Sequence, residues 1–226
     1  MKGILFYILY TNSLLALECI TAILGYRWMR KDWASAYKLL VALSCVTVAV
    51  EISAACCIPL HLNFERIYNV WSFVETGTIL VIQFLAVTHT WLRCLLMLLL
   101  AVLAAGTVAG YRLLPEFTQL NFPVMLFSLF VQLIGSCAAL ADVLLGTSDR
   151  PLSAQPDFWL ATGMLFYCCI FIAGHILRVY DTGIAARRFY TFFIIVANIF
   201  MYGGFIACFR TLRRQDRQKN PVPSAA

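Results

Sequence analysis

Hydrophobic residues form seven long runs that fill this chain almost from end to end, and short polar segments separate them. A run of about 20 apolar residues is long enough for an α-helix to cross the hydrocarbon core of a bilayer. The pattern therefore predicts an all-α membrane protein, a seven transmembrane helix bundle, with spans at 3–25, 37–60, 68–90, 93–114, 123–146, 157–177 and 188–209.

The composition leaves little room for anything but these spans. Hydrophobic residues make up 62% of the 226 residues and charged residues 12%, whereas charged residues are about a quarter of an ordinary soluble domain. We expect one seven-helix transmembrane domain, residues 1–210, followed by a basic, partly disordered cytoplasmic tail, residues 211–226. A separate kinase, nuclease or extracellular domain is not expected.

Basic residues lie mostly on one side of the predicted membrane. With the N-terminus outside, six lysines and arginines lie in the outer segments and eleven in the inner segments. The eleven inner residues are Arg27, Arg30, Lys31, Lys38, Arg93, Arg150, Arg210, Arg213, Arg214, Arg217 and Lys219. Cytoplasmic loops of membrane proteins are enriched in these residues, so the sequence predicts multi-pass insertion with the N-terminus outside and the C-terminus inside. Topology signals and contacts with anionic lipid head groups account for the net charge of +6, and no nucleic-acid partner is expected.

Residues with the chemistry of an enzyme or a cofactor site form no recognisable pattern. All nine cysteines lie within or at the edge of apolar runs, where cysteine acts as a small packing residue, so we expect no disulfide framework. The histidines His61, His89 and His175 lack metal-ligand spacing. The four lysines, at positions 2, 31, 38 and 219, lie outside the predicted spans or, for Lys38, at the very start of one, which excludes a retinal Schiff base deep in the membrane. We expect no catalytic residues, no metal and no cofactor.

Strongly polar residues occur inside several spans at a similar level. At about 1.5 Å per residue from the outer end of each span, Glu51 lies roughly 13 Å deep and Glu75 roughly 10 Å deep. The same half of the membrane contains Asn12, Gln132, Asn198, Tyr68 and, only a few ångströms deep, His175. Because polar groups are costly in lipid, most of these side chains are expected to face the bundle interior. Together they predict a polar cavity open to the outside that binds an unknown small ligand or cation.

Glu51 and Glu75 are the ionisable centre of this predicted cavity. Two carboxylates close together share a proton, so such a pair can hold a cation, accept an amine or relay protons. The alternative is that both acids stay protonated and hydrogen-bond across helices in a purely structural role.

A second polar level is predicted nearer the inner face. Glu18 and Gln83 both lie roughly 22 Å from the outer ends of their spans and are expected to bond each other. Asp142, close to the inner end of the fifth span, is expected to reach water or Arg150 in a structural role. In the fourth span, Gly106-Thr107-Val108-Ala109-Gly110 forms a Gly-xxx-Gly motif, which we expect to pack against another helix of the same chain.

Two segments carry a resemblance to a known group of proteins. They are Asn63-Phe64-Glu65-Arg66-Ile67-Tyr68, followed by Glu75, and Pro156-Asp157-Phe158-Trp159 with Gly163 and Tyr167. These segments resemble uncharacterised short seven-helix inner-membrane proteins of Bacteroidetes-type bacteria, a group with no assigned activity. The resemblance implies an inner-membrane location and marks Tyr68 and Glu75 as positions to test. Members look sensor-like because they lack a catalytic domain.

The function predicted from these observations is that of an integral membrane receptor or sensor subunit. It takes a small ligand or ion in the outward-facing polar cavity and signals through a partner protein, because the chain has no output domain of its own. The first alternative is a small secondary transporter or proton-coupled channel that uses the same intramembrane carboxylates. A membrane enzyme acting on lipid and a membrane scaffold of unknown purpose are further alternatives, and we do not expect an enzyme.

Overall fold

The computed structural model describes residues 2–57, 65–113, 122–146, 150–180 and 184–219, and for 2–12, 65–66, 113, 179–180, 184–188 and 219 it describes the backbone only. Within these ranges the chain folds into seven α-helices and one short 3-10 helix, η1, with no strand. The helices are α1 (Lys2–Trp28), α2 (Ser35–Cys57), α3 (Glu65–Ala86), α4 (Thr90–Leu113), α5 (Phe122–Leu145), η1 (Leu152–Ala154), α6 (Pro156–Tyr180) and α7 (Ile184–Lys219).

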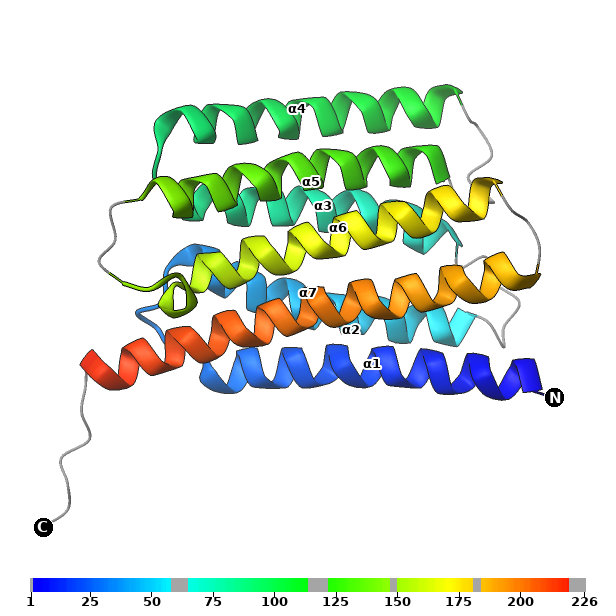
Figure 1. Ribbon diagram of the computed structural model, residues 1–226, viewed down its shortest axis with the longest axis horizontal. Helices are drawn as coiled ribbons and strands as arrows, with labels where there is room; N and C mark the ends of the chain where they lie inside the picture. The colour runs from blue at the N-terminus through cyan, green and yellow to red at the C-terminus, as the bar shows by residue number, and fades with distance from the viewer. Residues whose placement is uncertain (1, 58–64, 114–121, 147–149, 181–183, 220–226) are drawn as a thin grey trace, which may run out of the picture.

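The predicted all-α fold with seven helices is confirmed for this part of the chain (Figure 1). Six of the helices, α2 to α7, are long and apolar enough to cross a membrane, as in a multi-pass membrane protein. The 23 residues of α2 rise about 35 Å, slightly more than the hydrocarbon thickness of about 30 Å. Helix α1 has 27 residues, and its crossing of the membrane stays a prediction.

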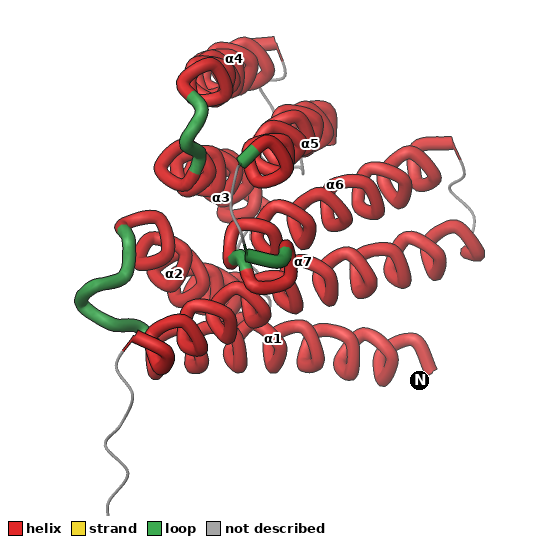
Figure 2. The backbone as a smooth tube through the Cα atoms, turned by 60° about the vertical axis from the view of Figure 1, so that its left-hand side comes forward, coloured by secondary structure: helices red, strands yellow, loops and turns green. Residues whose placement is uncertain are grey.

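Six helices form a ring, and the seventh lies outside it. Neighbouring contacts run from α1 to α2, α3, α5, α6 and α7, and α7 returns to α1. Helix α4 contacts α3 and α5 and lies far from α1 and α2, as Figure 2 shows. The ring therefore encloses an interior that side chains from six helices can share.

Small residues bring particular helix pairs close together. On α4, a Cβ atom added at Gly106 would lie 2.4 Å from the ring of Phe127, and one added at Gly110 would lie 2.4 Å from the side chain of Val124. Both contacts are with α5, so the prediction that the Gly-xxx-Gly motif packs within the chain is confirmed. Between α6 and α7, Gly163 and Gly204 face each other, so the backbones of the two helices are in direct contact.

Helix α7 continues beyond the predicted end of the seventh span at residue 209 and ends at Lys219. Its last turns pack onto the loops at that end of the bundle. The indole nitrogen of Trp33 donates to Asp216 at 2.7 Å, and the ring of Trp33 stacks on Phe209. The amide of Gln215 donates to the carbonyl of Ala154 at 2.8 Å. The first half of the predicted tail, residues 211–219, is therefore part of the folded helix, while 220–226 lie outside the described residues.

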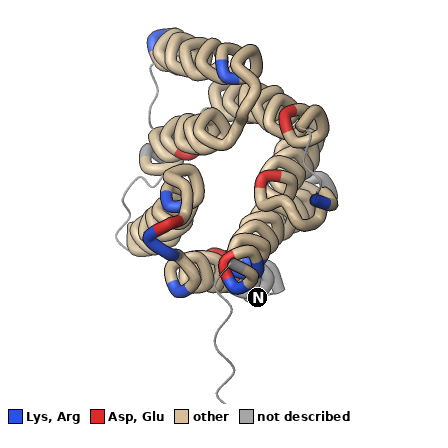
Figure 3. The backbone as a smooth tube through the Cα atoms, turned by 90° about the vertical axis from the view of Figure 1, so that its left-hand side faces the viewer, with Lys and Arg blue, Asp and Glu red and all other residues tan. Residues whose placement is uncertain are grey.

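One end of the bundle carries most of the basic residues. Viewed from this end in Figure 3, lysine and arginine positions lie where α1 and α7 end and α2 begins. Arg27, Arg150 and Arg214 are exposed there, and Arg30 lies 3.9 Å from Asp216. The basic residues thus gather at one end of the bundle, as the sequence predicted. The direction of insertion remains a prediction.

The contact between α6 and α7 yields a test with an adjacent control. A Cβ atom at residue 204 would lie 2.9 Å from the Cα of Gly163 and 2.8 Å from the carbonyl oxygen of Trp159, and neither backbone atom can move alone. Gly204→Ala should therefore lower the free energy of unfolding by about 1–3 kcal/mol. Thermal unfolding in detergent, followed by tryptophan fluorescence, measures the effect.

The neighbouring substitution Gly203→Ala is the control, because nothing lies within 4 Å of a Cβ added at residue 203. It should leave the melting temperature unchanged or raise it, since alanine favours a helix over glycine by roughly 0.5–1 kcal/mol. Equal effects of the two substitutions would contradict the close α6–α7 packing.

Candidate functional site

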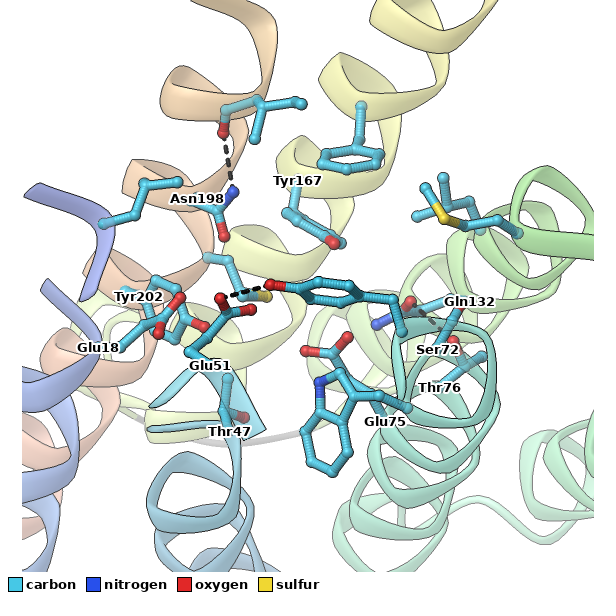
Figure 4. A pocket seen from close by; sticks show the side chains of 18 of the residues that line it. Glu18, Thr47, Glu51, Ser72, Glu75, Thr76, Gln132, Tyr167, Asn198 and Tyr202 are labelled. Carbon is cyan, nitrogen blue, oxygen red and sulfur yellow. Dashed lines mark hydrogen bonds between the residues drawn. The ribbon is translucent and has the colours of Figure 1, made fainter. Parts of the chain in front are cut away.

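A cavity of about 300 Å³ lies inside the ring of six helices. It is lined by Leu14, Leu15, Glu18, Thr47, Glu51, Tyr68, Trp71, Ser72, Glu75, Thr76, Met125, Leu129, Gln132, Tyr167, Phe171, Ile194, Asn198, Met201 and Tyr202. These side chains come from α1, α2, α3, α5, α6 and α7, and Figure 4 shows how they converge. The volume is at the lower end of the range for small-molecule sites in proteins.

The carboxylate of Glu51 lies near the middle of the cavity. The hydroxyl of Tyr68 donates a hydrogen bond to its Oε2 atom at 2.7 Å, which joins α2 to the first turn of α3 (Figure 4). One turn away on α2, Thr47 also lines the cavity, while its hydroxyl donates to the carbonyl of Leu43 in its own helix. The Glu51–Tyr68 pair therefore links α2 to α3 at the cavity.

Glu18 lies in the same cavity, beside the hydroxyl of Tyr202 (Figure 4). Its side chain is buried, with 5% of its surface exposed, and its Oε2 atom has no hydrogen-bond partner among the described residues. The predicted pair of Glu18 with Gln83 is wrong. Glu18 is the third acid of the cavity, at the same level as Glu51 and Glu75.

Two amides lie on the walls of the cavity. The side-chain oxygen of Gln132 accepts a long hydrogen bond from Thr76, at 3.5 Å, and its amide nitrogen is turned toward the cavity (Figure 4). This nitrogen has no partner in the described part of the chain, and Gln132 is only 2% exposed. Asn198 donates to the carbonyl of Ile194 on its own helix, which leaves its side-chain oxygen facing inward.

Aromatic rings line much of the remaining surface. Trp71 lines the cavity from α3, and Tyr167 and Phe171 line it from α6. The rings of Tyr167 and Phe171 contact each other with their centroids 5.2 Å apart. The cavity thus combines three carboxylates, two amides and several ring faces in a small space.

The structure brings together most of the residues that the sequence placed in the outer half. Glu51, Glu75, Gln132, Asn198 and Tyr68 all line the cavity. The fold therefore brings these five side chains, from α2, α3, α5 and α7, to one cavity. The side chain of Asn12 lies outside the described residues.

His175 is the predicted site residue that the described cavity does not include. It is 2% exposed and lies among the rings of Phe122, Phe171 and Tyr190. Its Nδ1 atom is 3.0 Å from the carbonyl oxygen of Phe171, one turn earlier in α6. The ring packs between α5, α6 and α7 about one helical turn beyond the cavity, so spacing by depth alone placed it wrongly in the site.

Gln83 and Asp142 have other partners. The amide nitrogen of Gln83 donates to the hydroxyl of Ser136 at 3.1 Å, and Gly135 leaves the space that the Gln83 side chain needs. Asp142 lies beside the start of α4. Its carboxylate accepts hydrogen bonds from the backbone N–H groups of Thr88 and His89, just before α4 begins. This arrangement satisfies donors at a helix N-terminus, which is the structural role that was predicted for Asp142.

Sequence reasoning missed several lining residues, mainly Thr47, Ser72, Thr76 and Tyr167. The signal was present as helical spacing. On α3, Tyr68, Ser72 and Glu75 recur at intervals of four and three residues, which places them on one face. Similar intervals join Thr47 to Glu51, Asn198 to Tyr202, and Met125 to Leu129 and Gln132.

No family model, no curated protein and no solved structure matches this chain. The resemblance to short inner-membrane proteins therefore stays a prediction, and the site is interpreted from its own geometry.

Two substitutions test whether a buried polar group stabilises the fold or only lines the cavity. Asp142→Ala leaves the N–H groups of Thr88 and His89 without their acceptor, and should lower the free energy of unfolding by about 1–2 kcal/mol. Gln132→Met removes a buried donor that has no partner among the described residues, and with it only the long bond from Thr76, so it should lower the melting temperature less than Asp142→Ala does. Thermal unfolding of both variants in the same detergent is the measurement. If Gln132→Met destabilises the protein as much as Asp142→Ala, the cavity polar groups have a structural role instead.

Proposed function

We propose that this protein is a membrane receptor or sensor subunit that binds a small ligand or ion in the cavity and signals through a partner protein. The observation that supports the proposal is a pair of buried polar atoms, Oε2 of Glu18 and Nε2 of Gln132, that line the cavity without a partner in the described residues. Buried polar groups are nearly always hydrogen-bonded, because an unpaired one destabilises the folded state. A bound ligand would complete both sets of bonds.

The proposed topology places the N-terminus outside and the basic end of the bundle inside the cell, in the inner membrane. The excess of lysine and arginine at that end supports this direction. The cavity then lies in the outer half of the bundle, within reach of a ligand from outside. The described part of the chain contains no separate output domain, so the signal requires a second protein.

A route from the cavity to the basic end runs along α7. Asn198 and Tyr202 line the cavity, and the same helix continues to Phe209, Gln215 and Asp216 at the other end. Those last residues contact the loop after α1 and the segment before α6. A helix shift of one or two ångströms at the cavity would therefore change the surface that a partner contacts.

Neutralising one acid tests the receptor proposal. Glu51→Gln keeps the size of the side chain and removes its charge, so we expect a melting temperature close to that of the wild type. The variant should still bind the partner but lose ligand-dependent regulation of it. Co-purification from native membranes, with the partner's activity assayed in each sample, is the measurement.

The control is Ser53→Ala, two residues further along α2. Ser53 is exposed on the outside of the bundle, and its hydroxyl donates to the carbonyl of Ala49 in its own helix. It should behave as the wild type. A large loss of stability in Glu51→Gln would favour the structural role of the acids.

A small proton-coupled transporter is the second candidate, and one observation favours it. Polar groups continue from the cavity toward the basic end: Ser136 donates to the carbonyl of Gln132 and accepts from Gln83. The Oε1 atom of Gln83 has no described partner and borders a void of about 10 Å³, enough for about one water molecule, which Asp157 also lines. Asp157 in turn accepts a hydrogen bond from Tyr37 at 2.8 Å.

Gln83→Leu separates the two candidates. In a transporter, this substitution interrupts the polar path and should reduce proton flux by about tenfold or more without removing ligand binding at the cavity. In a receptor, liposomes containing the wild type show no flux, and the substitution changes nothing in that assay. A pH-sensitive dye inside the liposomes records the flux. Flux in the wild type that is insensitive to both Glu51→Gln and Gln83→Leu would argue against the proposed path.

A further inference from the structure

We propose that the cavity binds a small organic amine in its ammonium form, one that also carries a hydrogen-bond acceptor such as a hydroxyl group away from the nitrogen. This inference rests on the proposed function, because it names the class of ligand for the same cavity. Four properties of the described lining support it: its charge, its unpartnered atoms, its aromatic rings and the separation of its acids.

The described lining of the cavity contains three acids and no basic side chain. Glu18, Glu51 and Glu75 come from three different helices, and no lysine, arginine or histidine is among the described residues that line the cavity. Arg178, in the aromatic cluster beyond the cavity, lies over the rings of Phe122 and Tyr190. Carboxylates removed from water require a positive charge or a proton, and an ammonium group supplies the charge together with directed N–H donors.

The unpartnered atoms define two further requirements. Oε2 of Glu18 is an acceptor and needs a donor, whereas Nε2 of Gln132 is a donor and needs an acceptor. The two side chains lie on α1 and α5 and so border the cavity from different helices. A ligand with an ammonium group at one end and a hydroxyl oxygen at the other satisfies both, which a simple inorganic cation does not.

The separation of the acids argues for an organic cation over a metal ion. Within the described ranges, no group of three histidine, cysteine, aspartate or glutamate side chains comes close enough together to hold a metal ion. The acids instead surround a space of about 300 Å³. Trp71, Tyr167 and Phe171 line that space, and the faces of aromatic rings attract ammonium groups.

The experiment compares amines with neutral compounds of the same shape. The full chain in lipid nanodiscs is titrated with ethanolamine and with tyramine, each of which carries an ammonium group with N–H donors and a hydroxyl group away from the nitrogen. Their neutral counterparts are ethylene glycol and tyrosol, in each of which a hydroxyl replaces the amine. Isothermal calorimetry gives the affinities, and thermal unfolding confirms binding to the folded state.

We expect at least one of the two amines to bind about tenfold more tightly, or better, than its neutral counterpart. Phenethylamine, which lacks the phenolic hydroxyl of tyramine, should bind more weakly than tyramine. Glu18→Gln and Glu51→Gln should each reduce the amine affinity, while Ser53→Ala on the outer surface of α2 leaves it unchanged. Should Glu18→Gln fail to fold, the comparison between charged and neutral compounds still decides the matter with the wild-type protein.

Equal affinity for the charged and neutral compounds would overturn the ligand class while leaving a ligand cavity in place. Binding of sodium, potassium or calcium ions with no binding of any amine would overturn it too. The absence of binding by all compounds would also overturn it. The receptor proposal is judged separately, by whether Glu51→Gln alters the regulation of a co-purified partner, so failure of one proposal is distinguishable from failure of the other.

Discussion

Polar side chains inside a bilayer must turn away from the lipid, and this constraint determines how the ring helices are rotated about their axes. Glu18, Glu51 and Glu75 face the interior, while apolar residues close to them in sequence, Ile20 and Val74, are exposed on the outer surface. Once each acid is directed inward, the other residues of its helix face follow at intervals of three and four positions. The shared cavity is therefore a consequence of hiding several polar groups in one interior.

The same constraint explains why α4 lies outside the ring. Among the described side chains of α4, Thr107 is the buried polar one, and the rest of the helix is almost entirely apolar. A helix with so little to hide gains nothing from a position around the cavity and can expose a broad face to lipid. It is fixed by other means: Gly106 and Gly110 allow close contact with α5, and Asp142 satisfies N–H groups at its start.

Seven helices and the depth of most polar residues could be predicted from the sequence, because hydrophobic length and a constant rise per residue are enough for both. The rotation of each helix about its own axis could not be predicted. His175 shows this limit, because it lies at a suitable depth but packs between helices instead of lining the cavity. Glu18 and Gln83 show another limit. Glu18 lies ten residues before the end of α1 (28 − 18) and Gln83 three before the end of α3 (86 − 83), so a longer α1 separates two residues that equal span lengths would have aligned.

Polar groups that serve only to join helices should be satisfied within the protein, and several here are. Asp142 bonds the start of α4, Trp33 bonds Asp216, and Tyr37 bonds Asp157. Other buried polar atoms have no partner among the described residues: those at Glu18 and Gln132 lie in the cavity, and those at Gln83, Thr107 and Thr162 lie elsewhere. An interior that existed only for stability would replace these groups with apolar ones, since an unpaired buried group destabilises the fold. The cavity is distinguished by having two such groups in one hollow, beside two more acids and several aromatic side chains, and this combination is what the proposed ligand site requires.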